Sequence, residues 1–159
     1  MKIVMLSDGF FDGLGYQENL LAKYYVALGH SVVIITSTYD TLDNFYKGSY
    51  DRKIPEATIF TKGIKIIRLR FSLFILDKIK KFSNIYKILM DENPDLIFFH
   101  DISFNLHEAV KFKKQNLDCR LIMDFHADYS NSAKNWISMI FLHKMIRKSY
   151  LYYSLKYID

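Results

Sequence analysis

Five short apolar runs are spaced along the chain, and each predicts a strand. β-Branched and aromatic residues dominate these runs, and polar residues follow them directly. The runs cover residues 2–7, 31–38, 64–70, 95–101 and 120–129. In the third run the alternation is clear enough to place polar side chains toward solvent or a partner, namely Lys65, Arg68 and Arg70.

Segments with helical spacing separate the runs. They cover residues 16–30, 73–93, 104–116 and 132–159. The first is expected to stop at Gly29, and its apolar positions at helical spacing are Leu20, Leu21, Tyr24, Ala27 and Leu28. The second reads as one basic amphipathic helix that ends at Asn93, because the residue before a proline is biased away from helix.

The alternation of strands and helices with tight connections predicts an α/β fold. A parallel pair joined through a helix takes a right-handed crossover, so we expect a Rossmann-like three-layer α/β/α domain with a mostly parallel sheet. Residues 39–63 break the pattern, since this polar, aromatic-rich segment contains Pro55 and exceeds the usual length of a connection. It is predicted to be a long loop.

Composition limits the class of protein. The 159 residues suffice for one domain, taken as residues 1–159. A net charge of +5, from 22 basic and 17 acidic residues, is too modest for a nucleic-acid-binding arm, and we expect no nucleic-acid partner. Cys119 is the only cysteine, which excludes an internal disulfide and fits a reducing, cytoplasmic compartment. No apolar run is long enough for a secretory signal or a membrane span.

The loop "DGFFDGLGYQE", residues 8–18, raises the question of nucleotide binding. A dinucleotide fingerprint needs a further glycine where this chain has Glu18, whose carboxylate would repel a diphosphate, and an acidic residue after the second strand, where the chain has "ITST". No lysine of a P-loop follows. The glycines either form a tight turn or leave backbone N–H groups at the helix start for a ligand.

Polar side chains follow the predicted strands at the carboxyl edge, where ligands bind in open α/β sheets. His100 and Asp101 end one run, and His126 and Asp128 lie near the end of another. A metal site is disfavoured because no close pair of ligands occurs, and we expect no metal or other cofactor. Recognition of a polar ligand, with modest acid–base or electrostatic help, fits better. The serines near the last run lack a nucleophile elbow.

The elements taken together resemble the N-terminal, acceptor-side domain of GT-B glycosyltransferases, of the retaining family 4 (glycosyltransferase group 1) type. The resemblance lies in "MKIVMLSDGFFDGLGYQENLLAKYYVALGHSVVIITS", "GIKIIRLR", "NPDLIFFHD" and "RLIMDFHAD", in the family's order and at about its spacing. It implies a domain that binds a sugar or lipid-linked acceptor, in surface polysaccharide or glycolipid biosynthesis. It also implies that Gly13, Leu14 and Gly15 line the site near the donor, and that His126 helps to orient the transferred sugar. Less constant positions of the site are matched by His100, Asp101 and Asp128.

Enzymes of this family carry a second Rossmann-like domain that holds the nucleotide-sugar. Nothing in residues 1–159 matches it, so we expect no turnover by this chain alone. The alternative hypothesis is a non-catalytic, flavodoxin-like binding or interaction module, because a fold does not settle a function.

Basic and aromatic residues also suggest peripheral attachment to the inner face of a membrane. On the predicted second helix the cations are Lys78, Lys80, Lys81 and Lys87, and on the last helix they are Lys144, Arg147 and Lys148. Interfacial aromatics accompany the latter, so an anionic lipid surface is a candidate partner. An ordinary solvated helix face is the competing interpretation.

Overall fold

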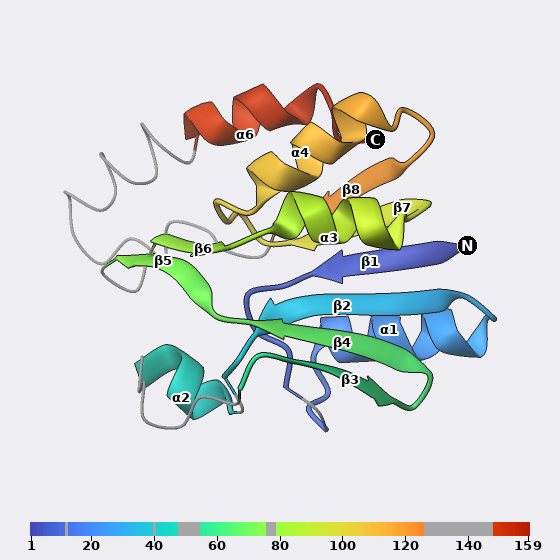
Figure 1. The fold of residues 1–159 in the computed structure, drawn as a ribbon, viewed down its shortest axis with the longest axis vertical. Helices are drawn as coiled ribbons and strands as arrows, with labels where there is room; N and C mark the ends of the chain where they lie inside the picture. The colour runs from blue at the N-terminus through green and yellow to red at the C-terminus, as the bar shows by residue number, and fades with distance from the viewer. Residues whose placement is uncertain (12, 40, 48–54, 76–78, 126–147) are drawn as a thin grey trace.

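A computed structural model describes residues 1–11, 13–39, 41–47, 55–75, 79–125 and 148–159. Its strands are β1 (Lys2–Leu6), β2 (Ser31–Ser37), β3 (Ala57–Thr61), β4 (Ile64–Leu69), β5 (Phe71–Ile75), β6 (Ile79–Phe82), β7 (Leu96–His100) and β8 (Arg120–Asp124). Its helices are α1 (Gln17–Ala27), α2 (Leu42–Lys47), α3 (Ile85–Glu92), α4 (Leu106–Gln115) and α6 (Lys148–Leu155). Figure 1 shows their arrangement.

The central sheet has six strands in the order β3-β4-β2-β1-β7-β8. Five of them are parallel, and only the edge strand β3 runs antiparallel, against β4. The α/β fold with a mostly parallel sheet is therefore confirmed. Each of the five predicted runs contains one of the parallel strands.

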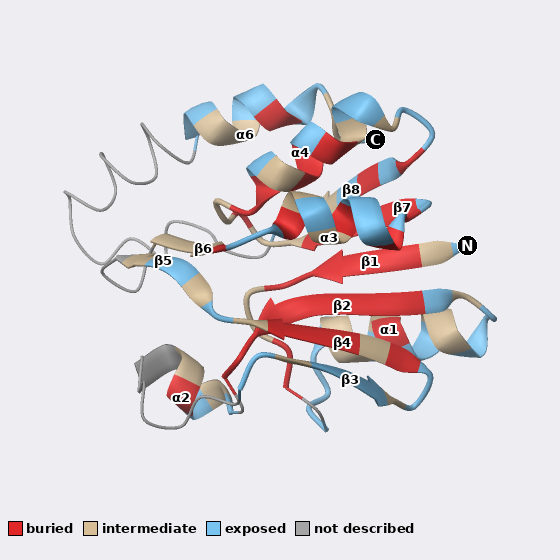
Figure 2. Ribbon diagram, in the orientation of Figure 1, coloured by how far each residue is buried: buried red, intermediate tan, exposed pale blue. Residues whose placement is uncertain are grey.

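Helices cover both faces of the sheet, with α1 on one side and α3, α4 and α6 on the other (Figure 1). Strand side chains alternate between two apolar cores, so that Val4 and Val33 pack toward α3 and α4 while Ile3 and Val32 pack toward α1. β1 and β2 are buried along almost their whole length (Figure 2). Continuous apolar strands are what a sheet covered on both faces requires.

The predicted basic helix over residues 73–93 is wrong. The chain instead forms the two-stranded hairpin β5-β6 and then the short helix α3. Asn84 has φ 61°, in the left-handed region, and begins α3. Lys80 and Lys81 lie on β6 and Lys87 on α3, so these cations do not share one helical face. Lys78 lies outside the described residues.

The segment 39–63 also differs from the predicted long loop, because it contains α2 and β3. The β3-β4 turn consists of Lys62 and Gly63, both with positive φ (50° and 79°), which matches the twist of a two-residue hairpin. Arg68 is buried against backbone carbonyls of its own chain, contrary to the expectation that it faces solvent or a partner, whereas Arg70 is exposed.

On α1 the predicted apolar face is mostly wrong. Leu20, Tyr24 and Leu28 are exposed, and Ala22 is buried with Leu21, Tyr25 and Val26 against the sheet. Aliphatic and aromatic residues fill both sides of this helix, so spacing alone could not choose between them. Its end was predicted correctly, since Gly29 has φ 81° and donates its N–H to the Val26 carbonyl. The predicted last helix is described only over α6.

We predict that Gly63→Ala destabilises the domain by about 1–3 kcal/mol. An added Cβ would lie 2.9 Å from Val26 Cγ1, at a φ that L-residues rarely adopt. Gly29→Ala is the matched control, because Gly29 has nearly the same φ (81°) and nothing within 4 Å of the added atom. Urea denaturation should show a larger loss for Gly63→Ala, and equal losses would exclude a role for the Val26 collision.

Candidate functional site

The carboxyl ends of the parallel strands bring together the first group of predicted site residues. Gly13, Leu14 and Gly15 lie between β1 and α1, His100 ends β7, and Asp101 follows it. Asp101 has φ 62° and donates its N–H to the Asp124 carbonyl at the end of β8. His126 and Asp128 lie outside the described residues, so their placement stays a prediction.

Two glycines of the β1-α1 loop have open surroundings. Gly13 needs a glycine-like backbone, with φ 83°, but Gly15 does not share this positive φ. A Cβ at either position would meet no atom of the described residues within 4 Å. Contacts with the described helix and sheet therefore do not explain Gly13 and Gly15. The glycine that packing does require is Gly9, where a Cβ would lie 2.9 Å from the Phe11 ring.

The start of α1 is held by consecutive side chains of its first turn. Its N-cap residue, Tyr16, makes no side-chain capping hydrogen bond. Gln17 Nε2 donates to Asp124 Oδ2 at 3.1 Å, Glu18 contacts His100, and Asn19 Nδ2 donates to the Phe11 carbonyl at 2.9 Å. The helix is thus anchored to β7, β8 and its own preceding loop.

His100 lies between two carboxylates. Its Nε2 is 2.8 Å from Glu18 Oε1, and its Nδ1 is 2.8 Å from Asp124 Oδ1 and 3.1 Å from Oδ2. Burial alone would lower the pKa of His100, but the hydrogen bonds and charges of Glu18 and Asp124 outweigh it and raise the pKa to about 9. The ring is therefore an imidazolium at neutral pH. Its positive charge also offsets the repulsion that Glu18 was expected to exert on a diphosphate.

Asp8 lies just beyond Ser7, the residue that follows β1, and is oriented by Asn105 at the start of α4. The Asn105 Oδ1 atom accepts the backbone N–H of Phe82 at 2.8 Å, which turns the amide nitrogen toward Asp8 Oδ1 at 3.1 Å. Asn105 is 1% exposed, so this arrangement is fixed within the core. Burial raises the pKa of Asp8 to about 6, against the lowering effect of Lys80 and with a further rise from Asp101.

A buried guanidinium lies on the other side of β1. Arg68 Nη1 donates to the carbonyls of Ser37 and Tyr39 at 3.1 and 3.2 Å, and more weakly to that of Phe10 at 3.4 Å. Ser37 ends β2 and Tyr39 follows it, whereas Phe10 lies in the β1-α1 loop. Arg68 therefore holds two loops of the carboxyl edge together, and its 6% exposure marks it as a structural group.

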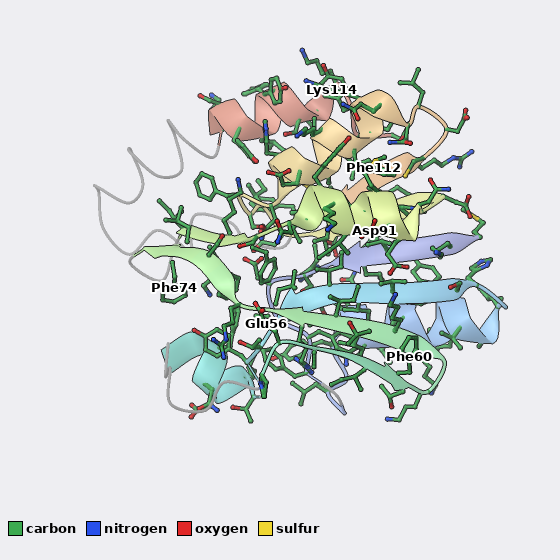
Figure 3. All side chains as sticks on the ribbon, in the orientation of Figure 1. Glu56, Phe60, Phe74, Asp91, Phe112 and Lys114 are labelled. Carbon is green, nitrogen blue, oxygen red and sulfur yellow. The ribbon has the colours of Figure 1, made fainter. Side chains whose placement is uncertain are left out.

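Aromatic rings surround Lys80 beside this edge. Its Nζ lies 3.7 Å from the Phe45 ring centroid, and 5.6 and 5.8 Å from those of Phe74 and Phe71. Phe71 also stacks on Phe82 with centroids 4.6 Å apart. The contacts fix the β5-β6 hairpin against α2, and Figure 3 shows Phe74 on that hairpin. Because the charge of Lys80 also acts on Asp8, the rings lie beside the carboxyl edge, and Phe45 and Phe74 form an aromatic wall around Lys80 there.

A comparison with protein-family models identifies the class. The model described as Glycosyltransferase Family 4 matches residues 12–156. The chain belongs to glycosyltransferase family 4. A search of curated proteins found no match to it. The resemblance seen in the sequence is confirmed, and the α/β fold with its mostly parallel sheet is consistent with one Rossmann-like half of the GT-B fold.

Several groups of this family 4 domain were missed from the sequence alone. Glu18 was considered only as a source of repulsion, and Asp124 and Asn105 were not considered at all. Strand register carried the signal for Asp124, because His100 and Asp124 end neighbouring parallel strands and are register partners. Nothing local in the sequence marked Asn105, whose role depends on the hairpin that was taken for a helix.

Among the described residues, no group of at least three His, Cys, Asp or Glu side chains is placed to hold a metal ion. None of the helices in this part of the chain is long and apolar enough to cross a bilayer.

We predict that Asp8→Asn stabilises the family 4 domain at pH 8 by about 1–2 kcal/mol. The pKa of about 6 in the folded state exceeds the ordinary value of 3.8, so the contribution of Asp8 to stability is greatest below pH 4 and falls as the pH rises through 6. Asparagine keeps an acceptor for Asn105 without a charge. Chemical denaturation at pH 5 and 8 should show a gain that grows with pH, while the exposed Asp118→Asn should show none. A gain that does not depend on pH would contradict the burial of the Asp8 charge.

Proposed function

We propose that this domain binds the acceptor in a retaining glycosyltransferase that uses a nucleotide-sugar. The reaction transfers a sugar from the diphosphate of the donor to a hydroxyl of a sugar or lipid-linked acceptor, in surface polysaccharide or glycolipid assembly. A donor-binding domain on the other side of the site is needed for turnover. Family membership supports the reaction class, and the polar residues gathered at the carboxyl edge support the location.

The observation that carries the proposal is the bare backbone at Gly15. Neither its φ nor any described residue within 4 Å of an added Cβ requires a glycine there. The space beside it lies at the start of α1, where backbone N–H groups favour negatively charged groups. A ligand that approaches the loop closely is a sufficient reason for the missing side chain.

The neighbouring groups have complementary roles in this proposal. Asp8, held by Asn105, accepts a hydrogen bond from an acceptor hydroxyl, and the aromatic wall of Phe45 and Phe74 contacts apolar faces of sugar rings. Asp101 and Asp128 contribute further polar contacts. His126 orients the transferred sugar. The leaving diphosphate is stabilised mainly by the donor-binding domain.

We predict that Gly15→Val leaves the domain folded but impairs catalysis. The added side chain meets no described atom within 4 Å of its Cβ, so the free energy of unfolding should change by less than about 0.5 kcal/mol. In an enzyme reconstituted with a donor-binding domain, sugar transfer should fall about 100-fold, because the donor is held away from the loop. Gly29→Ala, at the distant end of α1, should leave transfer unchanged.

The same enzyme tests the alternative of a non-catalytic module. Radiolabelled nucleotide-sugars and a panel of glycolipid and oligosaccharide acceptors should give a labelled product with the wild type. If Gly15→Val transferred sugar at the wild-type rate, the loop would not be part of the site. Absence of any product across the panel, together with no saccharide binding by the chain in saturation-transfer NMR, would favour the interaction module.

We further propose that the outer face of α3, α4 and α6 rests on an anionic membrane surface. Lys114 Nζ lies 4.8 and 4.7 Å from the ring centroids of Tyr153 and Tyr157, and Lys111 Nζ lies 4.3 Å from that of Tyr86. Lys114 projects from the outer side of α4 in Figure 3. Cations beside amphipathic rings suit the headgroup region, where a lipid-linked acceptor resides.

We predict that Lys114→Glu weakens binding to vesicles of mixed neutral and anionic phospholipid about tenfold, because it replaces an attractive charge by a repulsive one. Lys23→Glu on α1, also exposed, makes the same change of charge on the other face of the sheet and should have little effect. Co-sedimentation measures both. Equal losses, or binding that does not require anionic lipid, would contradict this orientation.

A further inference from the structure

The first part of the β1-α1 loop is held by Arg68, which donates to the Phe10 carbonyl, and by Asn105, which donates to Asp8. Its glycine end, residues 13–15, has few hydrogen bonds among the described residues. The Leu14 N–H reaches the Phe11 carbonyl only at 3.4 Å, and that carbonyl also accepts from Asn19 of α1. In the described part of the chain, no atom lies within 4 Å of a Cβ added at Gly13 or Gly15. The position of this glycine end therefore depends mainly on where the first turn of α1 is fixed.

The first turn of α1 is fixed through His100. The imidazole joins α1 to β8, because Glu18 and Asp124 face its two nitrogens, each at 2.8 Å. All three side chains are less than one-fifth exposed, at 14–19%. Gln17 strengthens the same link by donating to the second oxygen of Asp124.

This geometry sets the protonation state of the ring. A neutral imidazole has one N–H and one lone pair, so it could satisfy one carboxylate but would point a lone pair at the other. Only the imidazolium donates to both. The pKa of about 9 agrees with this requirement, since hydrogen bonds and charges of the carboxylates exceed the effect of burial. A ring in this state has no lone pair with which to accept a proton or bind a metal.

We infer that His100 is a positioning residue, which as an imidazolium clamps Glu18 and Asp124 and thereby holds the Gly13–Gly15 loop in place for the donor. The inference rests on the proposed function only in naming the donor as the ligand that the ordered loop binds. It differs from the expectation that His100 recognises the ligand directly. Its role is to fix α1 and to supply one positive charge beside two carboxylates.

The groups that face the clamp make its charge state predictable. Glu18 comes from α1 and Asp124 from β8, while Asp101 follows His100 on the chain. Asp8 after β1 is a further carboxyl group near Asp101. Replacing His100 by a neutral residue therefore adds one net negative charge at the edge that a nucleoside diphosphate would approach.

The first experiment uses the full 159-residue chain and needs no substrate. Long-range ¹H–¹⁵N NMR should show both nitrogens of His100 protonated at pH 7.5, with a transition near pH 9. In His100→Gln, backbone ¹⁵N relaxation should show a clear fall in the order parameters of Gly13 and Gly15, while those of α4 stay unchanged. The exposed His107→Gln is the matched control and should leave the loop as in the wild type.

Two variants of Glu18 separate the charge from the contact. Glu18→Gln keeps an acceptor for Nε2 and should leave the loop ordered while lowering the pKa of His100. Glu18→Ala removes both and should loosen the loop as His100→Gln does. In the wild type, the Gly13–Gly15 loop should be fully ordered below pH 6.5, the ordinary pKa of histidine. It should lose this order as the pH rises through about 9.

The second experiment uses the reconstituted two-domain enzyme. His100→Gln should raise KM for the nucleotide-sugar about tenfold or more and leave KM for the acceptor nearly unchanged, because it affects the donor side of the site. A neutral His100 at pH 7.5, or unchanged order parameters for the loop in His100→Gln, would overturn the clamp. A different result is that the loop loses order in His100→Gln as expected while the reconstituted enzyme transfers no sugar. That result would overturn the proposed function but leave the clamp supported.

Discussion

Parallel pairing around β1 is the constraint on which the rest of the structure depends. β1 pairs with β2 on one side and with β7 on the other, and β4 and β8 extend the same direction outward. Since both faces of these strands are buried, polar side chains are mostly confined to the strand ends. All the carboxyl ends then lie at one edge. The candidate site is assigned to this edge because polar groups from several parallel strands and from the β1-α1 loop meet there.

Charged groups at this edge are held by matched partners rather than left to solvent. The imidazolium of His100 joins two carboxylates, the guanidinium of Arg68 joins backbone carbonyls, and the carboxyl of Asp8 receives the amide of Asn105. Desolvation makes each of these groups costly without such partners. The arrangement fixes the loops of the edge in advance, which lowers the entropy that a ligand must remove on binding.

The parallel strands could be predicted from the sequence because five apolar runs are unambiguous in length and composition. The β5-β6 hairpin could not, since its mixture of Lys, Ile and Phe also satisfies helical spacing, and its stability comes from Phe71 stacking on Phe82 and from Lys80 against Phe45. Those contacts join residues from separate elements. The inward face of α1 could not be predicted either, because apolar residues lie on both sides of this helix.

The candidate site, too, could be predicted from the sequence only in part. Its location at the carboxyl edge, and the presence there of the glycine loop and His100, could be inferred from strand ends alone. The pairing of His100 with Glu18 and Asp124 required the register of β7 with β8 and the position of α1 on the sheet. Long-range pairings of this kind leave no local pattern in a single sequence.

Both ends of the described chain lie at the opposite, amino edge of the sheet. Lys2 begins β1 and donates its backbone N–H to Asp95, while Asp159 accepts the N–H of Leu121 near the start of β8 and pairs with Lys113. Figure 1 shows both ends away from the β1-α1 loop. An affinity tag, a fluorophore or a sensor-chip linkage at either end would therefore leave the carboxyl edge accessible. The orientation suits surface-immobilised measurements of ligands that approach from that edge.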